Sequence, residues 1–407
     1  MVELSRLIID LSAPRGSSTS SINSLIPQDQ FSLHYITTAD AIHSIKLAGR
    51  GSWLAKADIS DAFKVMPIHP SLRHLFGICW HGKFYFSTQL TFGCRSSPKI
   101  FDTLSEALCW ILLNVYHVPF LLHLLDDFLV ISPPSDAPAE AISNLKSLFS
   151  EVGVLLSEEK SIGPLHSLEF LGIILDTEKF EASLPESKLN HIRLLIEDFQ
   201  ISKTIKKWAL LSLLGYFNFA IRIIPQGRTF ISRLLALAST EKKKKNLDSY
   251  INISSDARKD IKMWSALIQH WSGLSMFYDN FISAPHDMAL FTDASSLGFG
   301  GLFNNQWFCS TWPEEMENIS PHLKSTALLE IYPMVAAAQL WGHLWSKKSI
   351  LFYCDNSTTV HIINKGRSSS PLIMQLLRRL VWISVSNNFL IQARHLPGIF
   401  NNAADAL

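Results

Sequence analysis

The segment that most constrains how this chain can fold is residues 121–131, which read LLHLLDDFLVI. Two apolar runs flank a pair of adjacent aspartates, a pattern that predicts two strands joined by a tight acidic turn. Two carboxylates beside buried strands repel one another, and ionised carboxylates are costly to bury unless they are paired or bind cations. The segment therefore predicts a hairpin that presents Asp126 and Asp127 to a divalent metal ion.

A second acidic segment lies upstream, where residues 53–69 read WLAKADISDAFKVMPIH. Asp58 ends a short apolar run that is typical of a strand, and Asp61 follows three residues later. Carboxylate oxygens suit Mg²⁺, which keeps several waters and takes one or two carboxylates together with substrate phosphates. Two such ions, held roughly 3.5–4 Å apart, can activate an attacking hydroxyl and stabilise the leaving oxygen. The two acidic segments together predict one two-metal site.

Four of the acids in the last third of the chain form a second spaced set, in a region where strand-like and helical segments alternate. This texture begins near His286 and indicates a compact α/β domain. Asp293 and Asp355 each end an apolar strand-like run, Glu330 lies in a helical segment, and Asp405 lies near the C-terminus. Acids at strand ends beside helix starts converge on one edge of a sheet. These residues therefore predict a second two-metal site.

Composition excludes several classes of protein. Hydrophobic residues make up 47% and charged residues 17% of the chain, which excludes a disordered tail. The formal net charge is +1, so binding to nucleic acid has to rely on local basic patches. The five cysteines form no C-x-x-C pair, which argues against a disulfide framework or a zinc site and fits a reducing compartment. We expect a soluble intracellular protein, cytoplasmic or nuclear, without a signal peptide.

Residues 109–125 are apolar enough to be mistaken for a membrane span. They are short for a span, which needs roughly 20 apolar residues, and they contain Asn114, His117, Pro119 and His123. We predict instead a core helix followed by a buried strand. Residues 139–153 have helical spacing, residues 168–176 read as a strand, and residues 185–273 are largely helical and hold most of the concentrated basic charge.

Several of these segments resemble the motifs of reverse transcriptases. Residues 58–63 (DISDAF) resemble the first catalytic motif, and residues 124–127 (LLDD) resemble the Y-x-D-D turn with Leu124 in place of the tyrosine. Residues 90–98 (LTFGCRSSP), which include Gly93, resemble the Gly-x-x-x-Ser-Pro segment under the template and the incoming nucleotide. The motifs follow the family's order over about 170 residues, so the resemblance is specific.

Three weaker matches extend the resemblance. Residues 153–160 (GVLLSEEK) resemble the segment whose lysine, here Lys160, faces the nucleotide phosphates. Residues 169–172 (EFLG) resemble the primer-grip hairpin, and residues 6–10 (RLIID) the fingers strand whose arginine, here Arg6, contacts the triphosphate. The resemblance implies that Asp58 and Asp126 bind metal, with Asp127 as the second carboxylate of the turn. It places Phe63 against the sugar, where its ring favours deoxynucleotides; the alternative for Phe63 is an ordinary core aromatic.

The later acids resemble the D-E-D-D set of ribonuclease H. The set is, in order, Asp293, Glu330, Asp355 and Asp405. His395 precedes the last acid by ten residues, at the position of a histidine that assists product release or proton transfer in retroviral and retrotransposon members. The set lies directly behind a polymerase module, which favours this interpretation over four unrelated surface acids.

The resemblance implies an α+β chain with a right-hand polymerase fold followed by an α/β ribonuclease H-like domain. Its expected parts are fingers and palm over residues 1–180, a helical thumb and connection over 181–285, and a C-terminally truncated ribonuclease H-like domain over 286–407. The implied activity is RNA-directed DNA polymerase with ribonuclease H, using Mg²⁺ or, as the alternative ion, Mn²⁺. The implied partners are dNTPs, a primed RNA or DNA template and an RNA–DNA hybrid, without a membrane; the oligomeric state stays open.

Two questions remain open at this stage. Residues 67–70 (PIHP) and 327–337 (ALLEIYPMVAA) favour a DIRS-like over a gypsy-like retrotransposon. The alternative function is an inactive or domesticated remnant that binds nucleic acid without catalysis, favoured by Leu124, by Pro333 close to Glu330, and by the expectation that the sequence is a fragment of a longer polyprotein. Against the remnant, all seven metal-ligand candidates are present. A cellular DNA-directed polymerase is opposed by the ribonuclease H set.

Overall fold

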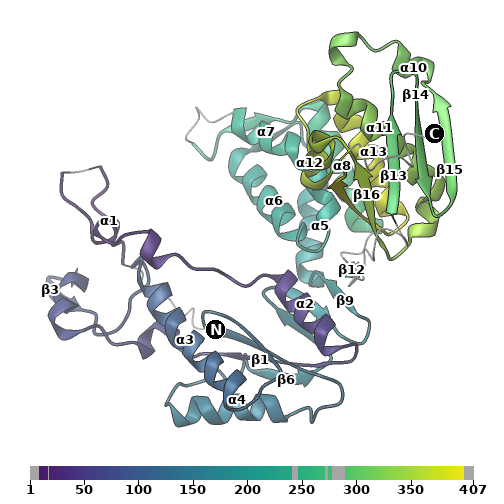
Figure 1. Ribbon diagram of the computed structural model, residues 1–407. Coiled ribbons are helices and arrows are strands. Elements are labelled where there is room, and N and C mark those ends of the chain that lie inside the picture. Colours follow the sequence, from purple (N-terminus) through teal and green to yellow (C-terminus); the bar gives the residue numbers. More distant parts are fainter. Residues whose placement is uncertain (1–8, 17, 241–245, 271–273, 277–288, 398–407) are drawn as a thin grey trace. The chain divides into compact units, whose positions relative to one another are not determined.

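The computed structural model describes residues 9–16, 18–240, 246–270, 274–276 and 289–397. The chain divides into two compact units, residues 1–181 and residues 182–407 (Figure 1). The expected limit near residue 285 lies outside the described residues, so the division into three domains stays a prediction. Among the described residues, no helix is both long and apolar enough to cross a membrane.

The first unit is built on a four-stranded antiparallel sheet in the order β4-β5-β1-β6. Its strands are β1 (Trp53–Asp58), β4 (Phe120–Leu124), β5 (Asp127–Ser132) and β6 (Ile162–Leu165). The predicted hairpin is present as β4 and β5, which leave only Leu125 and Asp126 in the turn. The core helix predicted before this hairpin is also present, as α3 (Ser97–Asn114).

Helices α3 and α4 (Glu140–Glu151) pack on this sheet around one apolar core, which includes Phe101, Leu145 and Phe128. Pro98 lies in the first turn of α3, where its missing N–H leaves no bond unmade. Helix α2 (Thr38–Ala48) contacts β4 and β5. The helix is closed at its start by a capping box between Thr37 and Asp40, which satisfies N–H groups that the first turn leaves free.

Short elements complete the first unit. They are α1 (Ile22–Leu25), η1 (Asp29–Phe31), η2 (Ala62–Val65), η3 (Pro70–Phe76), β2 (Gly77–Trp80), β3 (Lys83–Phe86), β7 (Ser167–Phe170) and β8 (Ile173–Asp176), with β9 (Glu181–Ser183) at the limit of the unit. The prediction of one strand over residues 168–176 is wrong. Leu171 and Gly172 both have positive φ, 49° and 77°, and turn the segment into an antiparallel hairpin of β7 and β8.

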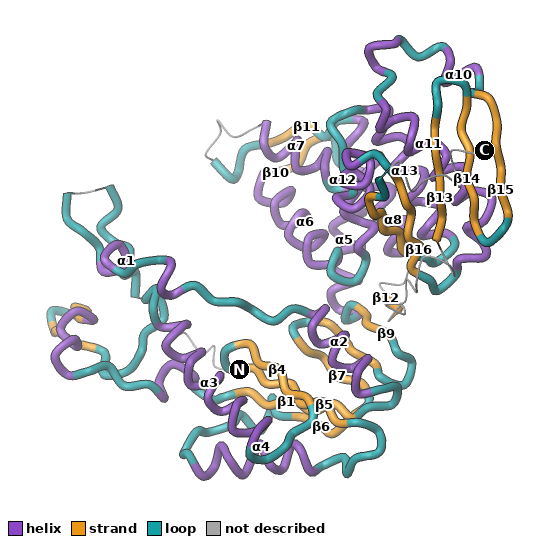
Figure 2. Tube along the Cα trace, viewed as in Figure 1, coloured by secondary structure: helices purple, strands orange, loops and turns teal. Residues whose placement is uncertain are grey.

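The second unit begins with helices, as the spacing over residues 185–273 predicted (Figure 2). These are α5 (Glu186–Ile201), α6 (Lys207–Ala220), α7 (Ser232–Thr240) and α8 (Ser255–His270), with η4 (Pro225–Phe230) and the short strands β10 (Thr204–Lys206), β11 (Tyr250–Asn252) and β12 (Leu274–Met276). The rings of Phe217 and Trp264 stack at 4.1 Å in their core. Gly227 lies against Trp264 so closely that a Cβ would come within 2.5 Å of the indole.

A five-stranded sheet in the order β15-β14-β13-β16-β17 follows. Its strands are β13 (Ala289–Ala294), β14 (Gly298–Phe303), β15 (Gln306–Thr311), β16 (Ser349–Cys354) and β17 (Leu390–His395). The first three strands are antiparallel, and β16 and β17 run parallel to β13. This arrangement brings the carboxyl ends of three strands to one edge of the sheet.

The helical elements of this part are α10 (Glu314–Glu317), η5 (Pro321–Leu323), α11 (Thr326–Trp341), η6 (Gly342–Trp345), α12 (Ser357–Lys365) and α13 (Pro371–Ser386). Helix α11 is capped by the side chain of Ser325 and continues through Pro333. Glu330 therefore lies inside the helix, one turn before the proline.

Candidate active site

The first predicted carboxylate site forms where strands β1 and β5 meet. Asp58 is the last residue of β1 and lies directly opposite Asp127, the first residue of β5. The backbone N–H of Ile59 donates to the carbonyl of Asp126 at 3.0 Å, which ties the β4–β5 turn to the end of β1. Because of this register, Asp127 lies beside Asp58 and senses the charge of Asp126 in the adjoining turn, although almost 70 residues of sequence separate β1 from that turn.

The negative charge of this cluster is only partly balanced by neighbouring basic side chains. Burial raises the pKa of Asp127 to about 6, and the hydrogen bond to Asp58 and the charge of Asp126 act in the same direction. The ammonium of Lys160 lies 3.0 and 3.2 Å from the two carboxylate oxygens of Asp58. This hydrogen bond raises the pKa of Lys160. Lys56 is also near, but its ammonium donates to the carbonyl of Glu169 at 3.1 Å.

The donor set fits a divalent cation. Asp58 is 7% exposed, and its partner across the sheet is another carboxylate whose charge is opposed by burial. A cation would relieve both the repulsion and the cost of burial, which hydrogen bonds to a single lysine leave uncompensated. Asp58, Asp126 and Asp127 are the residues that could hold it.

Phe63 lies in η2, close to this cluster in the sequence, and its side chain is buried. The residue is 9% exposed, and its ring packs against Phe92 at 4.9 Å and Phe101 at 5.7 Å. The backbone reaches this position through Asp61, which adopts a left-handed conformation with φ of 55° and pairs with Lys64 at 2.8 Å. Phe63 is therefore fixed by other aromatic rings; its contact with a sugar stays a prediction.

The loop around Gly93 is held by Asn23, a residue for which the sequence offers no signal. Asn23 is 7% exposed; its amide nitrogen donates to the Gly93 carbonyl at 2.8 Å, and its amide oxygen accepts from the backbone N–H of Arg95 at 2.8 Å. Gly93 itself has φ of 97°, which few other residues adopt. Arg6, the other predicted contact to the triphosphate, lies outside the described residues.

The second predicted site forms at the edge of the five-stranded sheet. The parallel register of β13 and β16 pairs Phe291 with Tyr353, which places Asp293 and Asp355 level with each other two residues further on. Glu330 of α11 is 2% exposed, and carboxylate oxygens of Glu330 and Asp355 lie within 4.8 Å of one another and of the sulfur of Cys354. Asp293 and Asp355 thus lie level at the carboxyl ends of neighbouring strands, and Glu330 of α11 lies beside Asp355. Asp405 lies outside the described residues.

Two further side chains border this second cluster. Nε2 of His395, the last residue of β17, lies 2.9 Å from the carbonyl oxygen of Asp355. The sulfur of Cys354 lies 3.8 Å from Oε2 of Glu330, and burial raises the pKa of this thiol so that it keeps its proton. Cys354 was not predicted; its position directly before Asp355 was the only available signal.

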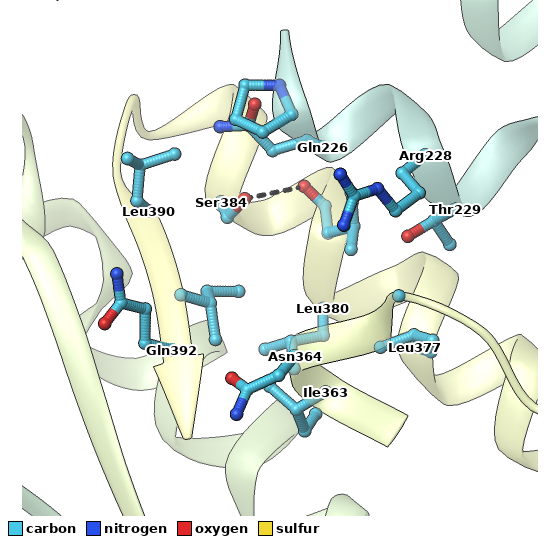
Figure 3. Close-up of a pocket in the computed structure, with 14 residues that line it drawn as sticks. Gln226, Arg228, Thr229, Ile363, Asn364, Leu377, Leu380, Ser384, Leu390 and Gln392 are labelled. Atoms are coloured by element: carbon cyan, nitrogen blue, oxygen red, sulfur yellow. Dashed lines mark hydrogen bonds between the residues drawn. The ribbon is translucent and has the colours of Figure 1, made fainter. Parts of the chain in front are cut away.

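The second unit also contains a cavity of about 210 Å³ (Figure 3). It lies between η4, α12, α13 and β17, and Leu380, Asn364 and Gln392 line it. Gln226 also lines it, is 8% exposed, and its amide has no hydrogen-bond partner among the described residues. None of the predicted site residues lines this cavity.

Part of the chain is similar to known proteins. Residues 10–175 match the family of reverse transcriptases (RNA-dependent DNA polymerases). The chain is 26% identical over 198 residues to the Pro-Pol polyprotein of Simian foamy virus type 1, covering 47% of this chain and 15% of that protein. It is 24% identical over 217 residues to the genome polyprotein of Petunia vein clearing virus (isolate Shepherd), covering 52% of this chain and 9% of that protein. The chain thus spans a small part of these relatives.

A solved structure of a foamy viral protease-reverse transcriptase in complex with double-stranded DNA matches with a TM-score of 0.50 and 16% identity. The match covers 96% of this chain and 62% of that one. This likeness concerns the fold. The fold class predicted from the sequence, a polymerase fold followed by a ribonuclease H-like domain, is confirmed.

Proposed function

Residues 10–175 match the family of reverse transcriptases, and from this premise we propose that the chain is an RNA-directed DNA polymerase with a second, ribonuclease H site. The observation that carries the proposal is the register that sets Asp58 opposite Asp127, with Lys160 on Asp58. Opposed carboxylates with one adjacent ammonium suit metal-assisted transfer of a nucleotide and have no evident use in a purely structural hairpin.

In the proposed reaction the 3′-hydroxyl of a primer attacks the α-phosphate of a dNTP. Asp58, Asp126 and Asp127 would hold divalent ions, Mg²⁺ or alternatively Mn²⁺, which when bound activate the hydroxyl and stabilise the leaving oxygen. The chain itself contributes positioning and charge. Lys160, whose side chain is 59% exposed, is free to turn its ammonium from Asp58 to the phosphates of the nucleotide. Phe63 would exclude a 2′-hydroxyl, and Arg6 and Gly93 would border the nucleotide.

The second site would hydrolyse the RNA strand of an RNA–DNA hybrid. Asp293, Glu330, Asp355 and Asp405 are the proposed metal ligands, and His395 the residue that assists product release or proton transfer. Support comes from the buried Glu330 beside Asp355 at the carboxyl ends of parallel strands. Cys354 keeps its proton and so contributes a neutral neighbour to Glu330.

The proposed partners are dNTPs, a primed RNA or DNA template and an RNA–DNA hybrid, in an intracellular compartment. The similar foamy viral structure was solved with double-stranded DNA, which supports a nucleic-acid partner. An origin in a gypsy-like or DIRS-like retrotransposon, with the DIRS-like kind favoured, remains part of the proposal. The second candidate function, a remnant that binds nucleic acid without catalysis, is favoured by one observation, Leu124 in place of the family's tyrosine.

Primer extension on an RNA template tests the proposal. The full chain is incubated with dNTPs and Mg²⁺ beside Asp126→Asn and a control, Glu178→Gln, which changes an exposed acid outside the motifs of the site. Extension by the wild type and the control that disappears in Asp126→Asn supports the polymerase. No extension by the wild type, in protein that is folded and binds the primer–template, would favour the remnant.

A further inference from the structure

Helix α3 and strand β4 share a partly buried polar cluster behind the turn that carries Asp126. Oδ1 of Asp102 lies 3.3 Å from Nε2 of His123, and Nδ1 of His123 lies 3.3 Å from the sulfur of Cys109. The other carboxylate oxygen of Asp102 accepts from Lys99 at 3.2 Å. The side chains of Asp102 and His123 are only 12% and 18% exposed. The cluster thus forms a continuous polar chain across the contact between helix and strand.

The apolar surroundings make it energetically costly to remove one member of this polar cluster. It borders the apolar core of the first unit, and the ring of His123 stacks on Phe128 at 5.8 Å. Burial raises the pKa of Cys109 to about 12, so its sulfur keeps a proton that it can donate to Nδ1 of His123. The ring proton is then on Nε2, facing Asp102. Removing His123 therefore takes the polar neighbour at 3.3 Å from the sulfur of Cys109 and from Oδ1 of Asp102, while Oδ2 of Asp102 keeps Lys99.

The same face of α3 also holds the turn itself. Ser105 is fully buried, and its hydroxyl donates to the carbonyl of Leu125 at 2.8 Å. Leu125 has φ of 55°, a conformation that a bulky residue adopts only when its surroundings impose it. Asp102 and Ser105 are three residues apart, so they lie on one face of the helix. Together they contact β4 at His123 and the turn two residues later.

We propose that Asp102 and His123 are positioning residues that hold the β4–β5 turn and thereby set Asp126 relative to Asp58. This inference rests on the proposed polymerase function of that site. Leu124 has no polar atom in its side chain. The polar side-chain contact between β4 and α3 is therefore made by the residue before it, His123. Neither Asp102 nor His123 contacts a substrate in this role; both act through the backbone of the turn.

The inference predicts a loss of rate without a loss of nucleotide affinity. A displacement of reacting groups by about 1 Å costs about 100-fold in rate. In primer extension with the full chain, His123→Leu should lower kcat by about 10- to 100-fold and leave KM for the dNTP within about twofold. His123→Gln keeps a donor and an acceptor and should recover most of the loss. Asp102→Asn combined with His123→Leu should be no slower than His123→Leu alone, because the two residues act as one unit.

A matched histidine in the same unit provides the control. Nε2 of His166 lies 3.9 Å from Glu178, so His166→Leu also removes a histidine beside a carboxylate, but one that does not contact the turn. Its kcat should equal that of the wild type. Thermal unfolding and binding of the primer–template are measured for every variant, so that kinetic constants are compared only among folded proteins.

A second measurement is independent of catalysis. Mn²⁺ binding, followed by electron paramagnetic resonance, should be weakened about tenfold by His123→Leu and unchanged by His166→Leu. A folded His123→Leu with the wild-type kcat and Mn²⁺ affinity would overturn the inference, as would a His123→Gln variant that is as slow as His123→Leu. If the wild type does not extend primers but His123→Leu still loses Mn²⁺ affinity, the polymerase proposal fails and the positioning role stands.

Discussion

Replacing Asp127 by asparagine should stabilise the metal-free protein while it removes the metal site. Burial, the hydrogen bond to Asp58 and the charge of Asp126 raise the pKa of Asp127 from 3.8 to about 6. A shift of about two units corresponds to about 3 kcal/mol at about 1.4 kcal/mol per unit. Because the side chain is only partly buried, solvent screening reduces this to about 1–2 kcal/mol. Asparagine has the same shape and can donate to Asp58.

The pH dependence has a definite sign. The pKa of Asp127 in the folded state lies above its value in the unfolded chain, so its contribution to stability is fully present below about pH 4 and is lost as the pH rises through about 6. At pH 8 the ionised side chain therefore opposes folding. Asp127→Asn should raise Tm there by about 2–8 °C, since 1 kcal/mol corresponds to about 2–4 °C in a unit of this size. At pH 4 the gain should disappear.

Scanning calorimetry of the full chain, with and without Mg²⁺, measures both effects. Mg²⁺ should raise the Tm of the wild type, because a ligand that binds only the folded state stabilises it, and should leave Asp127→Asn unchanged. Glu178→Gln is the control, because the side chain of Glu178 is 69% exposed and its change should stay within about 0.5 kcal/mol. A lower Tm of Asp127→Asn at pH 8, or an equal gain at pH 4 and pH 8, would refute this account of the cluster.

Three further predictions concern other parts of the chain. Glu330→Gln should abolish hydrolysis of labelled RNA in a hybrid and leave primer extension intact, with both products followed on gels. Loss of both activities would contradict the proposal that the two reactions use separate sites. Asn23→Ala removes two hydrogen bonds at the loop around Gly93 and should lower the free energy of unfolding in urea by about 1–3 kcal/mol. An unchanged urea midpoint would mean that the loop keeps its conformation without Asn23. Asp260→Leu leaves the partly buried guanidinium of Arg378, now 3.4 Å from that carboxylate, without this partner and should cost about 3–5 kcal/mol. Calorimetry that shows no loss of stability would exclude a structural role for the pair.

Local patterns in the sequence were sufficient for most elements near the two sites. The apolar runs around Asp126 and Asp127 specified the β4–β5 hairpin, and the periodicity of residues 139–153 specified α4. The same kind of pattern was insufficient for residues 168–176, where an apolar run that reads as one strand is interrupted by Leu171 and Gly172 in left-handed conformations. A single glycine in an apolar run does not say whether the chain turns there or continues.

The sequence by itself determined which acidic residues are candidates for the two sites, because they end apolar runs. It also determined their order along the chain and the family that this order resembles. Only the tertiary structure decided which of them meet. The pairing of Asp58 with Asp127 depends on the register of two strands that are about 70 residues apart in the sequence. The hydrogen bond from Asn23 to the Gly93 carbonyl joins residues with a similar separation in the sequence. The pair of Asp102 and His123 depends on how α3 packs against β4. Short-range periodicity records which face of an element is buried, but the partner of that face is selected by the packing of the whole unit.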